Sequence, residues 1–276
     1  MTRYTLSSRR AKTLAIFAAV ALPFVVLPFF MVDMDYSDHG IVPDQPERIF
    51  KPTQVLGVRN RLMAAAYSYN TTLSQIRRSP HIGYDISVIR AMEEMGLAAG
   101  HFDAWIDEHP STALVHVKYM PVNAQRYVAS TASFIRKSNP RIDAKTAWRE
   151  AAALVHYSAK YAVPYALTTA VAQVESTFDP NAVSPKGASG VMQVMWRLHK
   201  HLLSANGIMP TPGANPLSDP EQAIAAGCLL ISRYIRAYGS VQDALEKYYG
   251  TSSVTYQRKV NRNIASIMNH HSEFFK

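Results

Sequence analysis

The chain has little cysteine and no run of like charges that would indicate a nucleic-acid partner. Cys228 is the one cysteine in 276 residues, so no internal disulfide can form and the fold must rest on packing. We expect Cys228 to be a small, buried helix residue. The formal net charge is +9, yet no block of five or more Lys or Arg occurs. This excess favours an anionic partner such as phospholipid headgroups or an acidic polymer, and we expect no nucleic acid.

The sequence also lacks internal repeats, convincing strands and a metal-ligand pattern. Two histidine pairs occur, His199 with His201 and His270 with His271, but neither has convincing additional ligands. We therefore interpret these histidines as solvated or packed, and expect no metal and no organic cofactor. The remaining patterns are helical, which predicts a mainly α protein.

One long hydrophobic run is present at the N-terminus. Residues 13–32, TLAIFAAVALPFVVLPFFMV, are 20 residues without a charge, about the length that a helix needs to cross a bilayer. Arginine and lysine precede the run in residues 1–12, and Asp33 follows it, so the body of the protein is expected outside the cytoplasm. A cleavable signal peptide is the alternative. Because the run ends in bulky rather than small residues, we favour an uncleaved, single-pass anchor.

Two further regions separate this run from the most informative part of the chain. Residues 33–54 contain several prolines without helical periodicity, and we interpret them as a linker. Residues 55–142 carry apolar residues at helical spacing and no polar cluster that suggests chemistry. They are expected to form a helical spacer or packing layer of unknown role.

Two helices after Asp143 show clear ends and apolar faces. The segment 147–163 has helical periodicity and stops at Pro164, and the segment 219–239 has a capping acid, a proline and a final glycine (Asp219, Pro220 and Gly239). The faces expected to be buried are Trp148, Ala151, Leu154, Val155 and Ser158 in the first helix, and Ile224, Cys228, Ile231, Ile235 and Tyr238 in the second.

Between these helices a single acid ends an apolar stretch. Residues 165–175, YALTTAVAQVE, predict a largely buried helix with Glu175 as its last or nearly last residue, because Pro180 and Pro185 prevent its continuation. A helix C-terminus and apolar neighbours both disfavour an ionised carboxylate, so the pKa of Glu175 is expected to be raised. A raised pKa suits a general acid near neutral pH. Asp179, in FDP, is expected to stabilise a turn rather than to act in catalysis.

The residues around Glu175 resemble a known family. ESTFDPNAVSPKGASGVMQVM is similar to the signature of the soluble-type lytic transglycosylase domain, a lysozyme-like fold that cleaves peptidoglycan. DPEQAIAAGCLLISRYIRAYG resembles the long helix after the family's active-site loop, and ALEKYYGTSSVTYQRKV resembles its tyrosine-bearing terminal segment. The resemblance places a lysozyme-like catalytic domain within residues 143–276.

The resemblance also implies roles for particular residues. Glu175 would be the single catalytic acid/base, and Ser184 and Gln193 would hydrogen-bond the N-acetyl or hydroxyl groups of a sugar. Met195 would pack against the sugar, and Tyr248 would face Glu175 across the cleft. Gly187 and Gly190 are open to two interpretations, close approach to a ligand or ordinary turn glycines.

The sequence departs from the family pattern at two points. Trp196 stands where the family usually has proline, and Tyr248-Tyr249-Gly250-Thr251-Ser252 stands where the family has Tyr-Asn-Ala-Gly-Pro, with the segment from tyrosine to glycine one residue shorter. These differences affect the cleft floor and the sugar subsites, and leave Glu175 in place. They keep open a non-catalytic peptidoglycan-binding or envelope-assembly module. A hydrolytic lysozyme, which requires a second carboxylate in the cleft, is the other alternative.

The resemblance implies cleavage of the β-1,4 bond between N-acetylmuramic acid and N-acetylglucosamine, with closure of a 1,6-anhydro ring by the sugar's own C6 hydroxyl. The expected partners are peptidoglycan strands and, through residues 13–32, the inner membrane. The catalytic domain would then lie on the periplasmic or extracytoplasmic side.

The anchor predicts a simple fractionation result. The protein should be recovered from the membrane fraction with its N-terminus intact, and protease added outside the cytoplasm should digest its body. Deletion of residues 1–32 should remove the membrane association. A soluble periplasmic protein whose mature chain begins after about residue 30 would instead establish a cleaved signal peptide.

Overall fold

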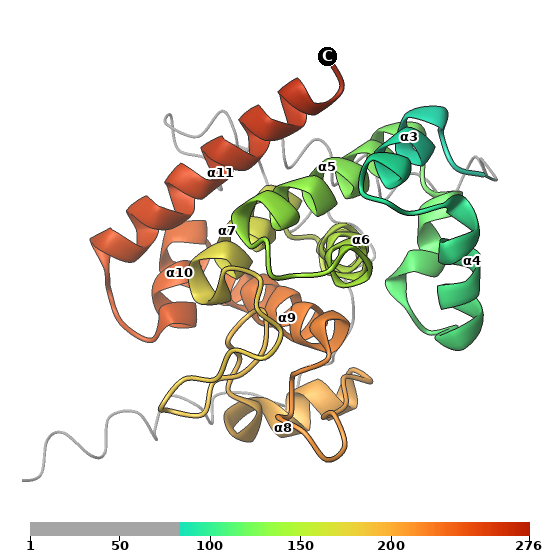
Figure 1. Cartoon of the computed structure of the whole chain (residues 1–276). Helices are drawn as coiled ribbons and strands as arrows, with labels where there is room; N and C mark the ends of the chain where they lie inside the picture. Colours follow the sequence, from blue (N-terminus) through green and yellow to red (C-terminus); the bar gives the residue numbers. More distant parts are fainter. Residues whose placement is uncertain (1–82) are drawn as a thin grey trace, which may run out of the picture. The chain divides into compact units, whose positions relative to one another are not determined.

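The structure is a computed structural model, which describes residues 83–276 and is built of helices (Figure 1). The helices are α3 (Ile86–Glu94), α4 (Ala99–Glu108), the 3-10 helix η3 (Ala113–Tyr119), α5 (Val122–Ser138), α6 (Ala144–Lys160), α7 (Tyr165–Ser176), α8 (Trp196–Ala205), α9 (Pro220–Tyr238), α10 (Val241–Tyr249) and α11 (Val254–Phe274). Within this part of the chain, strand-like pairing is limited to isolated bridges that join Ser189 to Val183 and to Val194. The mainly α prediction is confirmed.

The ends of the helices follow local sequence signals. The Asp143 side chain accepts a hydrogen bond from the Thr146 backbone N–H at 2.9 Å and caps α6. Asp219 caps α9 in the same way, Pro220 is its first residue, and Gly239 ends it in a left-handed conformation with φ 75°. The predicted ends of α9 are confirmed, whereas α6 begins at Ala144 and ends at Lys160, ahead of Pro164.

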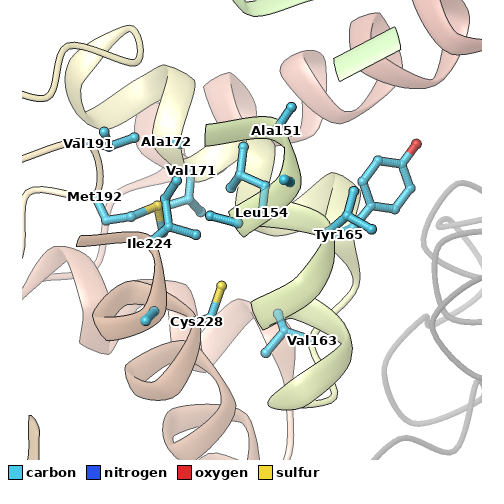
Figure 2. Close-up of a cluster of buried hydrophobic side chains, with 14 of the residues drawn as sticks. Ala151, Leu154, Val163, Tyr165, Val171, Ala172, Val191, Met192, Ile224 and Cys228 are labelled. Carbon is cyan, nitrogen blue, oxygen red and sulfur yellow. The ribbon is translucent and has the colours of Figure 1, made fainter. Parts of the chain in front are cut away.

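The core forms where α6 packs against α5, α7, η3 and α9. Figure 2 shows part of it, with Leu154 from α6, Val171 from α7 and Ile224 and Cys228 from α9 around the Met192 side chain. All of these side chains are fully buried, so the prediction for Cys228 is confirmed. Met192 lies so close to α9 that a Cβ atom on Gly227 would be 2.5 Å from its Cε. This contact fixes the loop before α8 onto α9.

The expected apolar faces are mostly buried, with one exception. Trp148, Leu154, Ile224 and Ile235 are inaccessible or nearly so, as predicted, but the Tyr238 side chain is exposed. Tyr238 is the last residue of α9, directly before the Gly239 C-cap. A periodic pattern cannot show where such packing stops.

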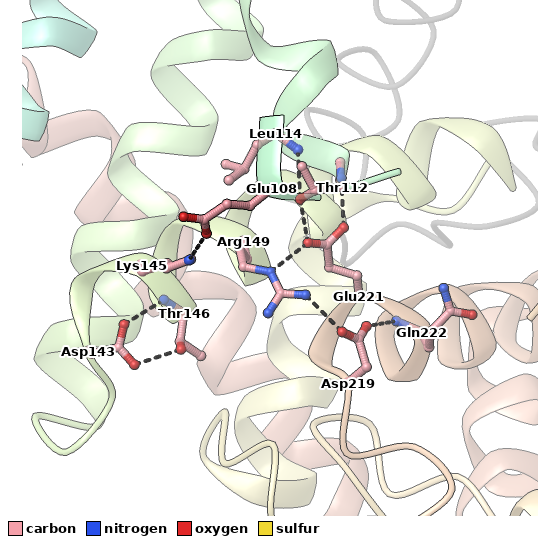
Figure 3. A network of polar contacts seen from close by, with 11 residues as sticks. Glu108, Thr112, Leu114, Asp143, Lys145, Thr146, Arg149, Asp219, Glu221 and Gln222 are labelled. Atoms are coloured by element: carbon pink, nitrogen blue, oxygen red, sulfur yellow. Dashed lines mark hydrogen bonds and ion pairs between the residues drawn. The ribbon is translucent and has the colours of Figure 1, made fainter. Parts of the chain in front are cut away.

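The helices before α6 pack directly onto the rest of the described chain. Arg149 on α6 donates hydrogen bonds to Asp219 and Glu221 at the start of α9, both at 2.8 Å (Figure 3). Glu221 also accepts hydrogen bonds from the Thr112 hydroxyl at 2.5 Å and the Ala113 backbone N–H at 2.6 Å. The described residues of the region with no assigned role, 83–142, are therefore a packing layer on α6 and α9, and residues 55–82 lie outside the described part.

The C-terminal helix α11 lies along α7 and α5 (Figure 1). On α5, the Tyr127 ring stacks on His271 with a centroid distance of 3.6 Å, and Ser130 Oγ is 2.7 Å from His271 Nδ1. Burial lowers the pKa of His271 to about 4, and the neighbouring His270 contributes to the shift. Both features show a packed histidine that is neutral near pH 7.

The predicted membrane helix, residues 13–32, and the linker, residues 33–54, lie outside the described residues. Among residues 83–276, none of the helices is long and apolar enough to cross a membrane.

One buried carboxyl group lacks the partners that buried acids normally have. Glu150 on α6 is fully buried, and neither of its carboxyl oxygens has a hydrogen-bond partner in the structure. Burial raises the pKa of Glu150 well above its usual value, and Asp143 and Asp179 add to the shift while Arg149 opposes it. The group is thus kept as a neutral acid inside the core.

We expect Glu150→Met, which has a similar volume, to raise the free energy of unfolding at pH 7 by about 1–3 kcal/mol. Because the folded-state pKa is raised, the wild-type protein loses stability as pH rises from about 4.3, the pKa of an unfolded glutamate, toward the folded-state value. The variant should lose this part of the pH dependence. Urea unfolding at pH 5 and pH 8 measures both effects, with Glu94→Met at an exposed position of α3 as the control. A lower stability of Glu150→Met at pH 8 would contradict the prediction.

Candidate active site

Glu175 is the penultimate residue of α7, as the sequence predicts, and its side chain is partly buried. Its Oε1 accepts a hydrogen bond of 2.6 Å from the hydroxyl of Tyr256, in the first turn of α11. The carboxyl group therefore lies where the end of one helix meets the start of another, supported by a phenol.

The electrostatics of Glu175 agree with the sequence prediction. Burial raises its pKa, and the hydrogen bond from Tyr256 partly opposes this effect. Burial and the adjacent Glu175 charge also raise the pKa of Tyr256, so this hydroxyl stays protonated and able to donate. A carboxyl with a raised pKa retains more of its proton near neutral pH and can act as a general acid.

The backbone after Glu175 turns sharply. Thr177 and Phe178 have φ values of 52° and 63°, in the left-handed region that non-glycine residues rarely adopt. Phe178 is fully buried and meets Phe134 edge to face with a centroid distance of 6.2 Å. The Thr177 carbonyl accepts a hydrogen bond of 3.0 Å from the Asn139 side chain. Contacts from α5 and its C-cap thus hold a conformation that the local sequence would not favour.

Two neighbours of Glu175 have structural roles. The Ser176 hydroxyl donates a 2.7 Å hydrogen bond to the Val191 carbonyl, which ties the end of α7 to the following loop. Asp179 Oδ1 accepts a 2.9 Å hydrogen bond from the Asn181 backbone N–H and closes a turn, as its sequence context predicts. Among the described residues, no second carboxylate contributes to the pKa shift of Glu175, which has burial and Tyr256 as its causes.

The loop 177–195 contains three of the predicted sugar-binding residues, and two of them bind the loop itself. Ser184 Oγ accepts a 3.0 Å hydrogen bond from the Ala188 backbone N–H. Gln193 Nε2 donates to the carbonyls of Ala182 at 2.9 Å and Gly190 at 3.1 Å, and Gln193 has a φ of 47°. These bonds fold the loop into a defined shape, so both residues determine its geometry.

Close approach explains one of the two glycines in this loop. A Cβ atom on Gly190, which has a φ of 76°, would lie 1.9 Å from the Leu217 carbonyl oxygen. Gly190 therefore permits contact with the protein itself. At Gly187 a Cβ would meet nothing within 4 Å, and its left-handed φ of 85° is the reason for glycine there.

Met195 and Trp196 lie at the end of the loop. Met195 is the N-cap residue of α8 and is partly buried, whereas Trp196 is the first residue of that helix and packs against the core. Tryptophan in place of proline is thus compatible with a helix start, because the first residues of a helix need no proline to form it.

The tyrosine that contacts Glu175 differs from the one predicted. The Tyr248 hydroxyl donates a 2.7 Å hydrogen bond to the Met192 carbonyl, and the bond to Glu175 comes from Tyr256. Burial raises the pKa of Tyr248 well above its usual value, and the nearby Glu175 adds to this shift. Tyr248 therefore lies near the acid but is bonded to the loop backbone. Both tyrosines belong to the segment identified from the sequence, and only the packing of α11 on α7 distinguishes them.

Comparison with known proteins gives a family match for the part of the chain that contains this site. Residues 153–267 match the family described as the Transglycosylase SLT domain. This part of the chain is therefore similar to transglycosylase SLT domains. Glu175, the loop 177–195, Tyr248 and Tyr256 all lie within the matched residues.

Relatives with curated names agree over a shorter segment. The chain is 36% identical over 94 residues to the membrane-bound lytic murein transglycosylase C of Yersinia pestis (strain Pestoides F), and equally to that of Yersinia pseudotuberculosis serotype O:1b (strain IP 31758). Each match covers 33% of this chain and 26% of the relative, so the chain aligns with about a quarter of the length of these proteins. No solved structure matches the chain.

Removing the Tyr256 hydroxyl should raise the pKa of Glu175 further, because that hydrogen bond is the contribution that lowers it. Tyr256→Phe keeps the ring and tests this directly. The titration of the Glu175 carboxyl carbon, followed by NMR in glutamate-labelled protein and assigned with Glu175→Gln, gives the value. Tyr248→Phe is the matched control and should move the pKa less, since its hydroxyl bonds the Met192 carbonyl. An unchanged or lowered pKa in Tyr256→Phe would contradict the assignment.

Proposed function

We propose that this protein is a lytic transglycosylase that cleaves the β-1,4 bond between N-acetylmuramic acid and N-acetylglucosamine in peptidoglycan. The observation that carries the proposal is the Glu175–Tyr256 pair, a single partly buried acid with a raised pKa, inside a transglycosylase SLT domain. The curated relatives that share this segment are named as lytic murein transglycosylases, which supports the same substrate class.

Glu175 acts first as an acid. Its carboxyl proton passes to the glycosidic oxygen while the bond between that oxygen and the muramoyl C1 breaks, which releases N-acetylglucosamine with a free 4-hydroxyl. The hydrogen bond from Tyr256 then stabilises the carboxylate that remains and fixes its orientation.

Glu175 acts next as a base. The carboxylate takes the proton of the muramoyl C6 hydroxyl as that oxygen bonds to C1 and closes the 1,6-anhydro ring. The acid is restored, no water is consumed, and one carboxyl group suffices because the substrate provides its own nucleophile. A hydrolase with two carboxylates would need a second acid to activate water, whereas Asp179 is occupied in closing a turn.

The loop 177–195 forms the part of the site that receives the sugar. In this proposal Ser184 and Gln193 maintain the shape of the loop and also contact N-acetyl or hydroxyl groups of the sugar. Ser184 accepts one hydrogen bond within the loop and retains an O–H that it can donate to the sugar. Gln193 uses its amide nitrogen within the loop and presents its amide oxygen as an acceptor. Met195 packs against the sugar, and Tyr248 holds the Met192 carbonyl that supports the loop.

The proposed location follows from the substrate. Peptidoglycan lies outside the cytoplasmic membrane, and residues 13–32, joined by the linker 33–54, would anchor the domain beside it as a single-pass inner-membrane protein. The formal net charge of +9 favours the approach to an anionic wall polymer.

Digestion of purified sacculi by the full chain tests the function. The wild-type protein should release muropeptides that end in 1,6-anhydromuramic acid, lighter by one water than lysozyme products, as mass spectrometry measures. Glu175→Gln should lower turnover by roughly 10²–10⁴-fold, because the amide can neither deliver nor accept the proton.

Asp179→Asn is the matched control, since it neutralises a nearby acid while an asparagine oxygen can still close the turn. It should keep most of the activity. Products with free reducing ends would show that water is the nucleophile and favour the hydrolytic lysozyme. Binding of sacculi without any cleavage would favour the binding or envelope-assembly module.

A further inference from the structure

A large aromatic side chain lies exposed beside the Glu175–Tyr256 pair. Tyr249 is the last residue of α10 and is 49% exposed, whereas Tyr256 is 4% exposed. Their rings stack with a centroid distance of 4.4 Å and an interplanar angle of 22°. One face of Tyr249 therefore covers Tyr256, and about half of the Tyr249 surface is open to solvent.

The chain holds Tyr249 in this place through the turn between α10 and α11. Gly250 ends α10 with a φ of 89°, a conformation that favours glycine. Glu246 Oε1 then accepts hydrogen bonds from the Ser252 hydroxyl at 3.0 Å and the Gln257 side chain at 2.9 Å, which join the end of α10 to the start of α11. The stacked geometry is thus supported from both helices.

Two successive contacts, through Tyr256, connect Tyr249 to Glu175. The Tyr249 ring lies on Tyr256, whose hydroxyl donates to Glu175 Oε1 at 2.6 Å. This is the position at which the sequence departs from the family pattern, with tyrosine in place of asparagine. The departure replaces a small amide with a broad apolar face at the edge of the site.

We propose that Tyr249 is an aromatic platform on which a sugar ring of the glycan strand stacks, next to the bond that Glu175 cleaves. The C–H face of a pyranose ring is apolar and matches the flat face of a tyrosine, while the sugar hydroxyl groups stay at the edge in water. Binding sites commonly combine such apolar faces with a few placed polar groups, which here are Glu175 and the loop 177–195. This inference rests on the proposed function and adds a residue that selects and holds the substrate.

Binding in a catalytically inactive background tests the platform. The full chain with Glu175→Gln is titrated, by calorimetry, with peptidoglycan glycan strands stripped of stem peptides. Adding Tyr249→Leu should weaken the affinity on the order of tenfold, since leucine fills space without a flat aromatic face. Tyr249→Phe and Tyr249→Trp should restore the binding, because both keep the face.

Tyr238→Leu is the matched control. Tyr238 is likewise an exposed tyrosine that ends a helix before a glycine, but its ring contact is with Tyr234 on α9. It should leave glycan affinity unchanged. Unchanged affinity in Tyr249→Leu, or a loss that phenylalanine and tryptophan do not restore, would overturn the platform.

Kinetics with an intact Glu175 distinguish a sugar platform from a side chain that only covers Tyr256. They also distinguish a failure of the platform from a failure of the proposed function. A platform predicts that Tyr249→Leu raises KM with little change in kcat. A fall in kcat at constant KM would overturn the platform and assign Tyr249 to shielding the acid. If the wild-type protein makes anhydro products while Tyr249→Leu binds strands normally, only the platform proposal fails. If the wild-type protein makes no such products, the proposed function itself is overturned.

Discussion

A carboxyl group that is partly removed from water needs a hydrogen-bond donor, and the packing of α11 on α7 provides one to Glu175. The donor, Tyr256, lies 81 residues further along the chain, so the 2.6 Å bond depends on the tertiary fold. The same contact brings Tyr249 over Tyr256 and places the end of α10 at the edge of the site. The position of the acid, its protonation and the shape of its surroundings all depend on this one helix pair.

Three glutamates show how the fold treats buried carboxyl groups in different ways. Glu221 is fully paired, with Arg149, Thr112 and a backbone N–H as donors, and it joins three segments of the chain. Glu150 has no partner, and burial raises its pKa well above the usual value, so it is kept neutral. Glu175 lies between these cases, with one neutral donor and partial exposure. In the function that we propose, Glu175 must both give and take a proton, and this intermediate environment suits that role because full pairing favours the anion and full burial prevents access.

The loop after α7 connects the site to the core through Met192. Its side chain lies against Gly227 on α9, and its carbonyl accepts the Tyr248 hydroxyl from α10. Ser176 and Gln193 add bonds from the helix end and within the loop. Thr177, Phe178 and Gln193 have strained, left-handed backbone conformations, which these contacts and those from α5 and its C-cap maintain. A preorganised loop of this kind holds its polar groups in fixed positions.

Local patterns in the sequence determined the helices, their caps, the buried faces and the location of Glu175 near a helix end, because each depends on residues within a few positions of one another. The resemblance around Glu175 was likewise local, and it identified the SLT domain that the family match confirms. The partner of Glu175 could not be read in this way. Three tyrosines lie in one terminal segment, and the crossing of α11 with α7 decides that Tyr256 reaches the acid while Tyr248 reaches the Met192 carbonyl. The unpartnered state of Glu150 came from the tertiary structure alone, and so did the choice between a spacer and a packing layer for residues 83–142, since burial is a property of contacts between segments distant in sequence.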